Sequence, residues 1–257
     1  MKAVVVIPAR YQSSRFPGKP LVSLNGKTLI QRVVESAAKV QGVAGVYVAT
    51  DDDRIKSHVE SFGGNVLMTP ESCQNGTERV AAAAGMLPND IDVFINWQGD
   101  SPLTPPSYPQ SLMQRLQETR GAELVTPVVK CDEAIFMNLK ADRDAKRVGG
   151  TMAVISCSQR ALYFSKEMVP YSDKVGAADA AFYFHVGMYG YRRDVLLAYP
   201  SWPVGPLEKI EGLEQLRFLE NDRYVDTAIV EGRGHWEVNN PEDVPLVERL
   251  LKEHGID

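Results

Sequence analysis

The feature of this sequence that most constrains its fold is an alternation of short apolar runs with longer amphipathic segments. Apolar runs typical of buried parallel strands lie at 3–7, 43–50, 65–68 and 92–96. Segments with the apolar spacing of helices follow the first three runs, at 21–40, 51–62 and 77–86. Strands that alternate with helices favour a parallel sheet with helices on both faces and right-handed crossovers. We therefore predict an α/β fold with a doubly wound, mostly parallel sheet.

The second half of the chain has a less regular pattern. We predict helices at 110–119, 206–220 and 241–253, and strands at 123–129 and 225–229. Between about 131 and 199, short strand-like runs such as 151–155 and 187–191 are separated by polar loops. We expect a single domain over 1–257, with an inserted α+β subdomain at about 131–199 that packs on the sheet.

The composition excludes several classes of function. A net charge of -5 argues against a nucleic-acid-binding surface, and no apolar stretch approaches the length of a membrane span. The chain starts directly with a strand and shows no signal-peptide pattern. Cys73, Cys131 and Cys157 are far apart and form no CxxC pair, so we expect neither a disulfide framework nor a zinc site. A cytoplasmic location fits this cysteine usage.

The loop after the first strand carries three cations close together, Arg10, Arg15 and Lys19. Arginine forks suit phosphate oxygens, lysine adds a mobile point charge, and glycine and serine let backbone N–H groups come close. The loop follows the carboxyl end of a strand, where open α/β sheets bind ligands. Neither the P-loop nor the dinucleotide fingerprint occurs here. We interpret the loop as a triphosphate site, although a solvated basic loop would show the same residues.

Two further polar loops suggest a nucleotide site. Residues 74–79 (QNGTER) form a small loop before a predicted helix, where backbone groups can meet the edge of a base, although the same pattern also suits a helix N-cap. Asp100 follows the strand at 92–96, where a carboxylate facing a triphosphate would be a Mg²⁺ ligand. An aspartate at a strand end is also a common turn residue, so a purely structural role for Asp100 stays open.

Seven motifs in order resemble those of the 3-deoxy-manno-octulosonate (KDO) cytidylyltransferases, a family of sugar nucleotidyltransferases. Besides 7–20 (IPARYQSSRFPGKP), 74–79 and 98–103, they are 160–166, 185–191, 206–217 and 238–243. The resemblance covers nearly the whole chain. It implies a nucleotide-diphosphosugar transferase fold, cytidylyl transfer from CTP to an acidic 2-keto sugar for lipopolysaccharide biosynthesis, Mg²⁺ as cofactor, and a homodimer. The subdomain at about 131–199 would then bind sugar and form the dimer.

The resemblance also implies roles for particular residues. Those expected to be catalytic are Lys19, Arg10 and Asp100. The nucleotide is expected to contact Arg10, Arg15, Lys19, Asn75, Gly76, Arg79 and Gln98. The sugar is expected to contact Lys166, His185, Tyr189, Glu211 and Gln215, and the metal to contact Asp100 and Asn239. From helical spacing, Glu208, Glu211 and Gln215 are predicted to share one helix face, which could also be a plain surface face; a lone histidine among aromatics such as His185 is also often structural.

Four positions depart from the family pattern: Asn75, Ser101, Lys166 and Asn239 stand where Ser, Glu, Arg and Asp are usual. The change at Asn239 removes a negative charge from the expected metal site, and Glu237, on the same strand face, is placed to compensate. These departures leave the sugar open between KDO and its 8-amino analogue. Three further functions stay open as well: a sialic-acid type of cytidylyltransferase, a transferase for a neutral sugar phosphate, and a protein that holds CTP without turnover.

Overall fold

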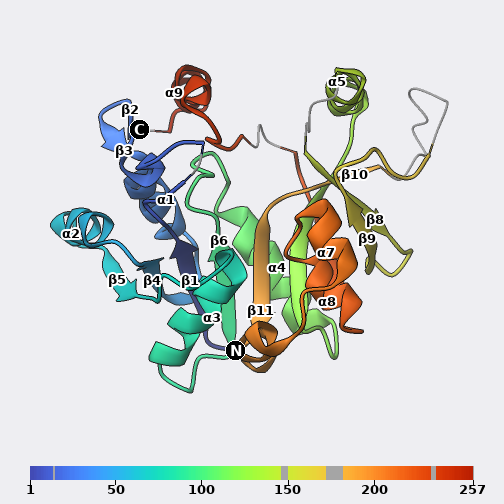
Figure 1. Ribbon diagram of the computed structural model, residues 1–257, viewed down its shortest axis with the longest axis horizontal. Helices are drawn as coiled ribbons and strands as arrows, with labels where there is room; N and C mark the ends of the chain where they lie inside the picture. Colours follow the sequence, from blue (N-terminus) through green and yellow to red (C-terminus); the bar gives the residue numbers. More distant parts are fainter. Residues whose placement is uncertain (14, 146–149, 172–181, 233–235, 257) are drawn as a thin grey trace.

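The computed structural model describes residues 1–13, 15–145, 150–171, 182–232 and 236–256 (Figure 1). Ser14 of the cationic loop and parts of the segment 131–199 therefore lie outside the described residues. Among the described residues, none of the helices combines the length and the apolar character that crossing a membrane requires.

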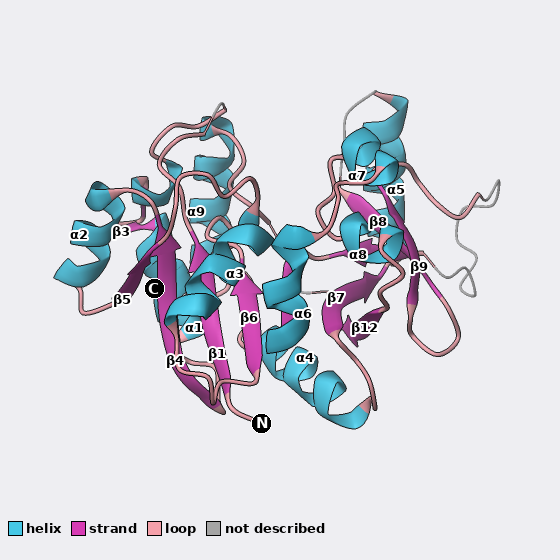
Figure 2. Ribbon diagram, turned by 60° about the horizontal axis from the view of Figure 1, so that its bottom comes forward, coloured by secondary structure: helices cyan, strands magenta, loops and turns pink. Residues whose placement is uncertain are grey.

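The first half of the chain forms the predicted parallel sheet. Its strands are β1 (Ala3–Pro8), β4 (Val43–Thr50), β5 (Asn65–Met68) and β6 (Val93–Trp97), and they lie in the order β5-β4-β1-β6, all parallel. The helices that follow the first three of these strands along the chain are α1 (Leu29–Ala37), α2 (Asp53–Ser61) and α3 (Gly76–Met86). The prediction of strands alternating with helices is confirmed for this half (Figure 2).

Two apolar layers cover the two faces of the sheet because side chains alternate along β1. Val5 and Ile7 face one layer, which contains the buried apolar residues of α1, α2, α4 (Ser107–Glu118) and α9 (Val244–Glu253). Val4 and Val6 face the other layer, which contains those of α3, α6 (Arg193–Ala198) and α8 (Leu216–Glu220). A strand buried on both faces reads as a continuous apolar run, which is why β1 was recognisable in the sequence.

The second half continues the same sheet. The strand β11 (Met188–Arg192) lies antiparallel between β6 and β7 (Leu124–Lys130), and β12 (Val225–Val230) pairs parallel with β7. Beyond β7 follow β10 (Tyr183–His185), β8 (Thr151–Ile155) and β9 (Ala161–Ser165). The expectation that the segment 131–199 packs on the sheet is wrong for its described strands, because they extend the sheet. Hydrogen bonding to β11 covers the edge that β6 would otherwise expose.

Several shorter elements were not predicted from the sequence pattern. These are the hairpin β2 (Ser23–Leu24) and β3 (Lys27–Thr28), the helices α5 (Glu133–Asp144) and α6, and three 3₁₀ turns, η1 (Lys19–Leu21), η2 (Tyr199–Ser201) and η3 (Pro241–Asp243). Two of the 3₁₀ turns matter for the site, because η1 carries a cation of the first loop and η2 packs beside α3.

The single helix predicted at 206–220 is two helices. The first, α7 (Pro206–Glu211), ends at Gly212, which adopts a left-handed conformation with φ of 63°, and α8 begins at Leu216. Glycine takes this conformation without the steric cost that other residues meet. The predicted shared helix face of Glu208, Glu211 and Gln215 is therefore wrong.

The carboxyl ends of β1 and β6 approach each other closely at Gly99. A Cβ atom on Gly99 would lie 2.9 Å from the backbone oxygen of Pro8, closer than such contacts occur. The residue must therefore be glycine for the turn after β6 to lie against the end of β1. This close approach brings the acidic turn beside the cationic loop.

Replacing Gly99 with alanine should therefore destabilise the fold. We expect the free energy of unfolding, measured with urea, to fall by about 1–3 kcal/mol because the backbone must shift to relieve the contact. Gly85→Ala is the matched control, since a Cβ atom at Gly85 in α3 has no neighbour within 4 Å. That substitution should raise stability by up to about 1 kcal/mol through helix propensity. An unchanged urea midpoint for Gly99→Ala would contradict the steric reason for this glycine.

Candidate active site

A cavity of about 230 Å³ lies where β1 and β6 end and α3 begins. Every residue predicted to contact the nucleotide lines this cavity, and so does Asp100; the lining includes Arg10, Arg15, Lys19, Asn75, Gly76, Arg79, Gln98 and Asp100. The structure therefore brings three separate sequence motifs to one place. The carboxyl end of a parallel sheet is where such folds bind ligands.

The cationic loop and the acidic turn are joined by an ion pair. The Nζ atom of Lys19 lies 2.6 Å from Oδ2 of Asp100, and both side chains are mostly buried. Arg10 and Arg15 are exposed at the rim, where Nη2 of Arg15 donates a hydrogen bond of 3.3 Å to Oδ1 of Asn239. The cavity thus combines mobile positive charge with one carboxylate, as a site for a polyphosphate and a cation requires.

A cation–π contact between Arg54 and Tyr11, outside the cavity, supports the cationic loop. The backbone oxygen of Tyr11 accepts a hydrogen bond of 2.9 Å from Gly18, whose φ is 72°, and a Cβ atom on Gly18 would lie 3.1 Å from the Tyr11 ring. The guanidinium carbon of Arg54 lies 3.3 Å from the centre of that ring, and Asp52 holds Arg54 through bonds of 2.6 Å and 3.0 Å. The loop is thereby fastened to the start of α2. Asp52 also caps α2, because its side chain accepts hydrogen bonds from the backbone N–H groups of Arg54 and Ile55.

Two carboxylates influence each other at the acidic turn. Burial raises the pKa of Asp100, the ammonium of Lys19 opposes that rise, and the negative charge of Glu237 adds to it. The backbone N–H of Val238 donates to the backbone oxygen of Asp100 at 2.9 Å, which holds the segment around Glu237 against the turn. A second cation beside Lys19 would relieve the repulsion between the two carboxylates.

The side chains at this turn fit a hard divalent cation. Asp100, Glu237 and Asn239 offer only oxygen ligands, which Mg²⁺ prefers. Within the described part of the chain, no group of three or more His, Cys, Asp or Glu side chains is arranged to hold a metal by itself. Mg²⁺ commonly takes one or two carboxylates and completes its shell with phosphate oxygens and water. The donors present therefore fit Mg²⁺ that arrives with a nucleotide, and the assignment of Asn239 as a ligand stays a prediction.

The loop predicted to read the base is also a helix cap. Oδ1 of Asn75 accepts from the backbone N–H of Glu78 at 2.8 Å, and Nδ2 of Asn75 contacts the hydroxyl of Tyr199 at 3.3 Å. The helix N-cap that the sequence pattern left open is thus confirmed, while Asn75 and Gly76 still line the cavity. The backbone N–H groups of Gln74, Thr77 and Glu78 already donate to side chains of the protein, and the contact of this loop with a base stays a prediction.

Arg79 lines the cavity but its charge is already balanced. Its guanidinium lies 2.7 Å from Oδ2 of Asp51 and 2.7 Å from Oγ1 of Thr69, and the side chain is 4% exposed. These contacts connect α3 to the ends of β4 and β5. The predicted contact of Arg79 with the nucleotide stays a prediction.

The residues predicted to bind sugar lie outside the lining of the cavity, in two groups. Nε2 of His185 lies 2.8 Å from Oγ1 of Thr126, and its ring packs on that of Tyr189, whose hydroxyl donates to Oε1 of Gln215 at 3.1 Å. Nε2 of Gln215 is buried and has no hydrogen-bond partner among the described residues. A buried amide without a partner is costly, so a ligand oxygen would stabilise it.

The second group contains Lys166 and Glu211. The carboxylate of Glu211 accepts from Oγ of Ser165 at 2.7 Å and from the backbone N–H of Lys166 at 2.9 Å. Nζ of Lys166 lies near the turn at Gly212. Glu211 thus ties α7 to β9, beside the break between α7 and α8.

The first group adjoins the cavity through Gly187. A Cβ atom on Gly187 would lie 3.6 Å from Oε1 of Glu237 and 3.7 Å from Cγ of Gln98. Gln98 lines the cavity, and Gly187 follows His185 by two residues. The residues predicted to contact the nucleotide and the first group predicted to contact the sugar are therefore neighbours across the turn from β10 to β11.

The family can be decided by comparison with known proteins. The Cytidylyltransferase family model matches residues 4–226 of the chain. This chain belongs to the cytidylyltransferase family. It is thus a nucleotidyltransferase.

Full-length relatives refine this assignment. The 3-deoxy-manno-octulosonate cytidylyltransferase of Maricaulis maris is 40% identical, with 99% of each chain covered. The 8-amino-3,8-dideoxy-manno-octulosonate cytidylyltransferase of Shewanella pealeana is also 40% identical, with 98% of this chain and 99% of that protein covered. The structure of CMP:2-keto-3-deoxy-manno-octonic acid synthetase complexed with CTP is 37% identical with a TM-score of 0.88, covering 99% of this chain and 100% of the other. The resemblance inferred from the motifs and the predicted fold class are confirmed.

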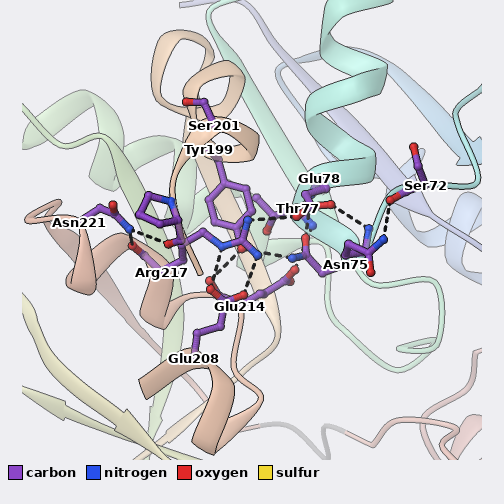
Figure 3. A network of polar contacts seen from close by, with 12 residues as sticks. Ser72, Asn75, Thr77, Glu78, Tyr199, Ser201, Glu208, Glu214, Arg217 and Asn221 are labelled. Atoms are coloured by element: carbon purple, nitrogen blue, oxygen red, sulfur yellow. Dashed lines mark hydrogen bonds and ion pairs between the residues drawn. The ribbon is translucent and has the colours of Figure 1, made fainter. Parts of the chain in front are cut away.

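A buried polar network of this cytidylyltransferase was not predicted from the sequence (Figure 3). The guanidinium of Arg217, 3% exposed, donates to both oxygens of Glu208 at 2.7 Å each and to Glu78 at 3.0 Å. Its guanidinium carbon lies 4.3 Å from the centre of the Tyr199 ring. The network thus joins α7 and α8 to the first turn of α3. The sequence contains the charged residues Glu208 and Arg217, but it does not show that the helix breaks at Gly212 and so lets the two side chains meet.

The same network reaches the loop that lines the cavity. The half-buried Glu214 accepts through its carboxylate from the backbone N–H of Thr77 at 3.0 Å, and the Tyr199 hydroxyl donates to the backbone oxygen of Glu214 at 3.1 Å (Figure 3). Burial raises the pKa of Glu214. The residue before Gln215 is thereby tied to the residue after Gly76, so the predicted sugar and nucleotide residues share one support.

Removing the charge of Arg217 should destabilise the protein strongly. We expect Arg217→Met to lower the free energy of unfolding in urea by about 3–5 kcal/mol, because Glu208 would remain buried without its partner. The matched control is Arg249→Met, which breaks an exposed pair with Glu253 of 3.8 Å. Its expected cost is below about 1 kcal/mol. Equal effects of the two substitutions would show that the buried network is not a major support.

Proposed function

We propose that this cytidylyltransferase transfers CMP from CTP to KDO and releases pyrophosphate, as a step of lipopolysaccharide biosynthesis. The observation that carries the proposal is the shared cavity, in which three cations, the loop at 74–79 and Asp100 meet. The matching family and the relatives named for KDO support the choice of CTP and of this sugar.

The reaction that suits this geometry is an in-line displacement at phosphorus. The anomeric 2-hydroxyl of the sugar loses its proton to water and attacks the α-phosphorus of CTP, the bond to the bridging oxygen breaks, and pyrophosphate leaves with its electron pair. Arg10, Arg15 and Lys19 bind the phosphates and offset the charge that builds on the leaving group. Transfer of this kind needs positioning and charge compensation, and no side-chain nucleophile is required.

The ion pair between Lys19 and Asp100 is the resting form of this site. When a triphosphate enters, the ammonium of Lys19 turns to its oxygens and Asp100 becomes available to a divalent cation. When bound, Mg²⁺ would neutralise phosphate charge and lower the pKa of the attacking hydroxyl. The distance of 2.6 Å between Nζ and Oδ2 supports this exchange, because it places both groups at one point of the cavity.

We assign the sugar to the region of His185, Tyr189 and Gln215, with Lys166 and Glu211 beside it. The buried Nε2 of Gln215, which lacks a partner among the described residues, supports a bound hydroxyl or carboxylate oxygen. Lys166 carries the positive charge that an acidic sugar needs, without the two-pronged geometry of arginine.

We further propose a homodimer in the cytoplasm. Among the described strands, β9 is the outermost of the sheet on its side, and Leu162 on β9 and Ile210 on the adjacent α7 are 61% and 80% exposed. An edge strand flanked by exposed apolar side chains suits pairing with a second copy. The three cysteines are unpaired thiols, which suits a reducing compartment. Sedimentation as a monomer at micromolar concentration would contradict the dimer.

Lys19 provides the direct test of the catalytic proposal. With CTP, Mg²⁺ and KDO, Lys19→Ala should lower kcat/KM for pyrophosphate release at least about 100-fold, because charge on the leaving group loses its mobile partner. The matched control is Lys39→Ala, at an exposed lysine outside the lining of the cavity, which should leave the rate unchanged. A loss of less than about threefold for Lys19→Ala would remove Lys19 from the mechanism.

The choice of sugar can be tested by competition. Both oxygens of Glu211 are already engaged and Lys166 is positive, so an 8-ammonium group gains no partner among these residues. We expect kcat/KM for KDO to exceed that for its 8-amino analogue at least about tenfold. The reverse preference would assign the amino sugar.

A wider panel of substrates separates KDO activation from three further functions. Turnover with a nine-carbon keto acid would indicate the sialic-acid type of enzyme. A preference for UTP or GTP with a neutral sugar phosphate would indicate a transferase for such sugars. CTP binding without pyrophosphate release from any keto acid would show a binding protein.

A further inference from the structure

The segment 236–240 runs beside the acidic turn. The backbone N–H of Val238 donates a hydrogen bond of 2.9 Å to the backbone oxygen of Asp100, which sets the position of this segment along the acidic turn. The Val238 side chain is fully buried in the apolar layer that also contains Val5 and Ile7. The side chains of Glu237 and Asn239 lie together, because Nδ2 of Asn239 donates to Oε2 of Glu237 at 3.3 Å. The charge of Glu237 also acts on Asp100, so this pair of side chains lies beside the acidic turn.

The amide of Asn239 is already engaged on both of its atoms. Oδ1 accepts from Nη2 of Arg15 at 3.3 Å, and Nδ2 donates to Oε2 of Glu237 at 3.3 Å. The opposite orientation of the amide would place its N–H₂ group against a guanidinium and its oxygen against a carboxylate. The two partners therefore fix the orientation of the amide: its oxygen accepts from Arg15 of the cationic loop, and its nitrogen donates to Glu237.

Glu237 occupies the place between the acidic turn and the sugar residues. One of its oxygens lies near Gly187, whose other close neighbour is the cavity residue Gln98, and the other oxygen faces Asn239. Its negative charge acts on Asp100 and contributes to the raised pKa of that carboxyl. An aspartate at 239 would repel Glu237, whereas the asparagine donates to it and orients it.

The charges at this point favour a divalent cation. Asp100 and Glu237 bring two negative charges to this point, and Lys19 pairs with Asp100 in the resting site. When Lys19 turns to the phosphates, the carboxylate of Asp100 in the cavity lining and that of Glu237, which lies beside Asp100 but outside the lining, no longer share the ammonium. A pair of carboxylates together with phosphate oxygens is a usual set of ligands for Mg²⁺.

We propose that Glu237 is the second carboxylate ligand of the divalent cation, and that Asn239 is a positioning residue that links Glu237 to Arg15. This inference rests on the proposed function, since it places the cation where CTP would bind. It replaces the assignment of Asn239 as a ligand by one in which the amide holds the true ligand in place.

Binding of Mn²⁺ in the presence of saturating CTP, followed by electron paramagnetic resonance without any sugar, tests the proposal. Mn²⁺ replaces Mg²⁺ at oxygen sites and its free form gives the signal. We expect Glu237→Gln to raise the Kd for Mn²⁺ at least about tenfold and Asn239→Ala to raise it less than about threefold. Glu242→Gln, at an exposed position nearby, should match the wild type. Calorimetry with CTP alone confirms that each variant keeps its nucleotide site.

Two results would overturn the proposal. One is a Glu237→Gln variant that binds Mn²⁺ as the wild type does. The other is an Asn239→Ala variant that loses as much affinity as Glu237→Gln or more, which would make Asn239 the ligand. A wild-type protein that binds neither CTP nor Mn²⁺ would instead contradict the proposed function, so the two failures are distinguishable.

Discussion

The contact between the Lys19 ammonium and the Asp100 carboxylate is the interaction on which the site depends. It joins a loop that follows the first strand to a turn that follows β6, although the two residues are 81 positions apart. Parallel strands make this possible, because their carboxyl ends lie at one edge of the sheet. The close approach of Gly99 to the end of β1 brings the two groups within hydrogen-bonding distance. In the proposed reaction these opposite charges separate, Lys19 toward the triphosphate and Asp100 toward a divalent cation.

The parts of the fold and site that could be predicted are those fixed by local pattern. The run from Ala3 to Ile7 is buried on both faces and is recognisable as a parallel strand from its composition alone. Once the strands are placed, the loops after them must gather at one edge. The meeting of Arg10, Lys19 and Asp100 therefore followed from the order of elements, before any side chain was placed.

The parts that could not be predicted depend on contacts between distant segments. Nothing in the run around Tyr189 shows that it enters the sheet beside β6, because the same alternation suits a strand of a separate subdomain. The helix break at Gly212 was hidden by a periodicity that continues through it, since a single glycine is tolerated within helices. The pairing of Glu208 with Arg217 needs that break. The contacts among the residues predicted to bind sugar could therefore not be predicted from the sequence, although the residues themselves were named.

The stack of Arg54 on Tyr11 has a consequence for variation within this fold. Gly18 of the cationic loop packs on the Tyr11 ring, which Arg54 of α2 covers, and neither Tyr11 nor Arg54 lines the cavity. Under the proposed function, sequence change in α2 would alter how strongly the cationic loop binds a triphosphate while every lining residue stays the same. Evolution or design would then adjust nucleotide affinity through a surface helix, without changing the residues proposed to contact the substrates.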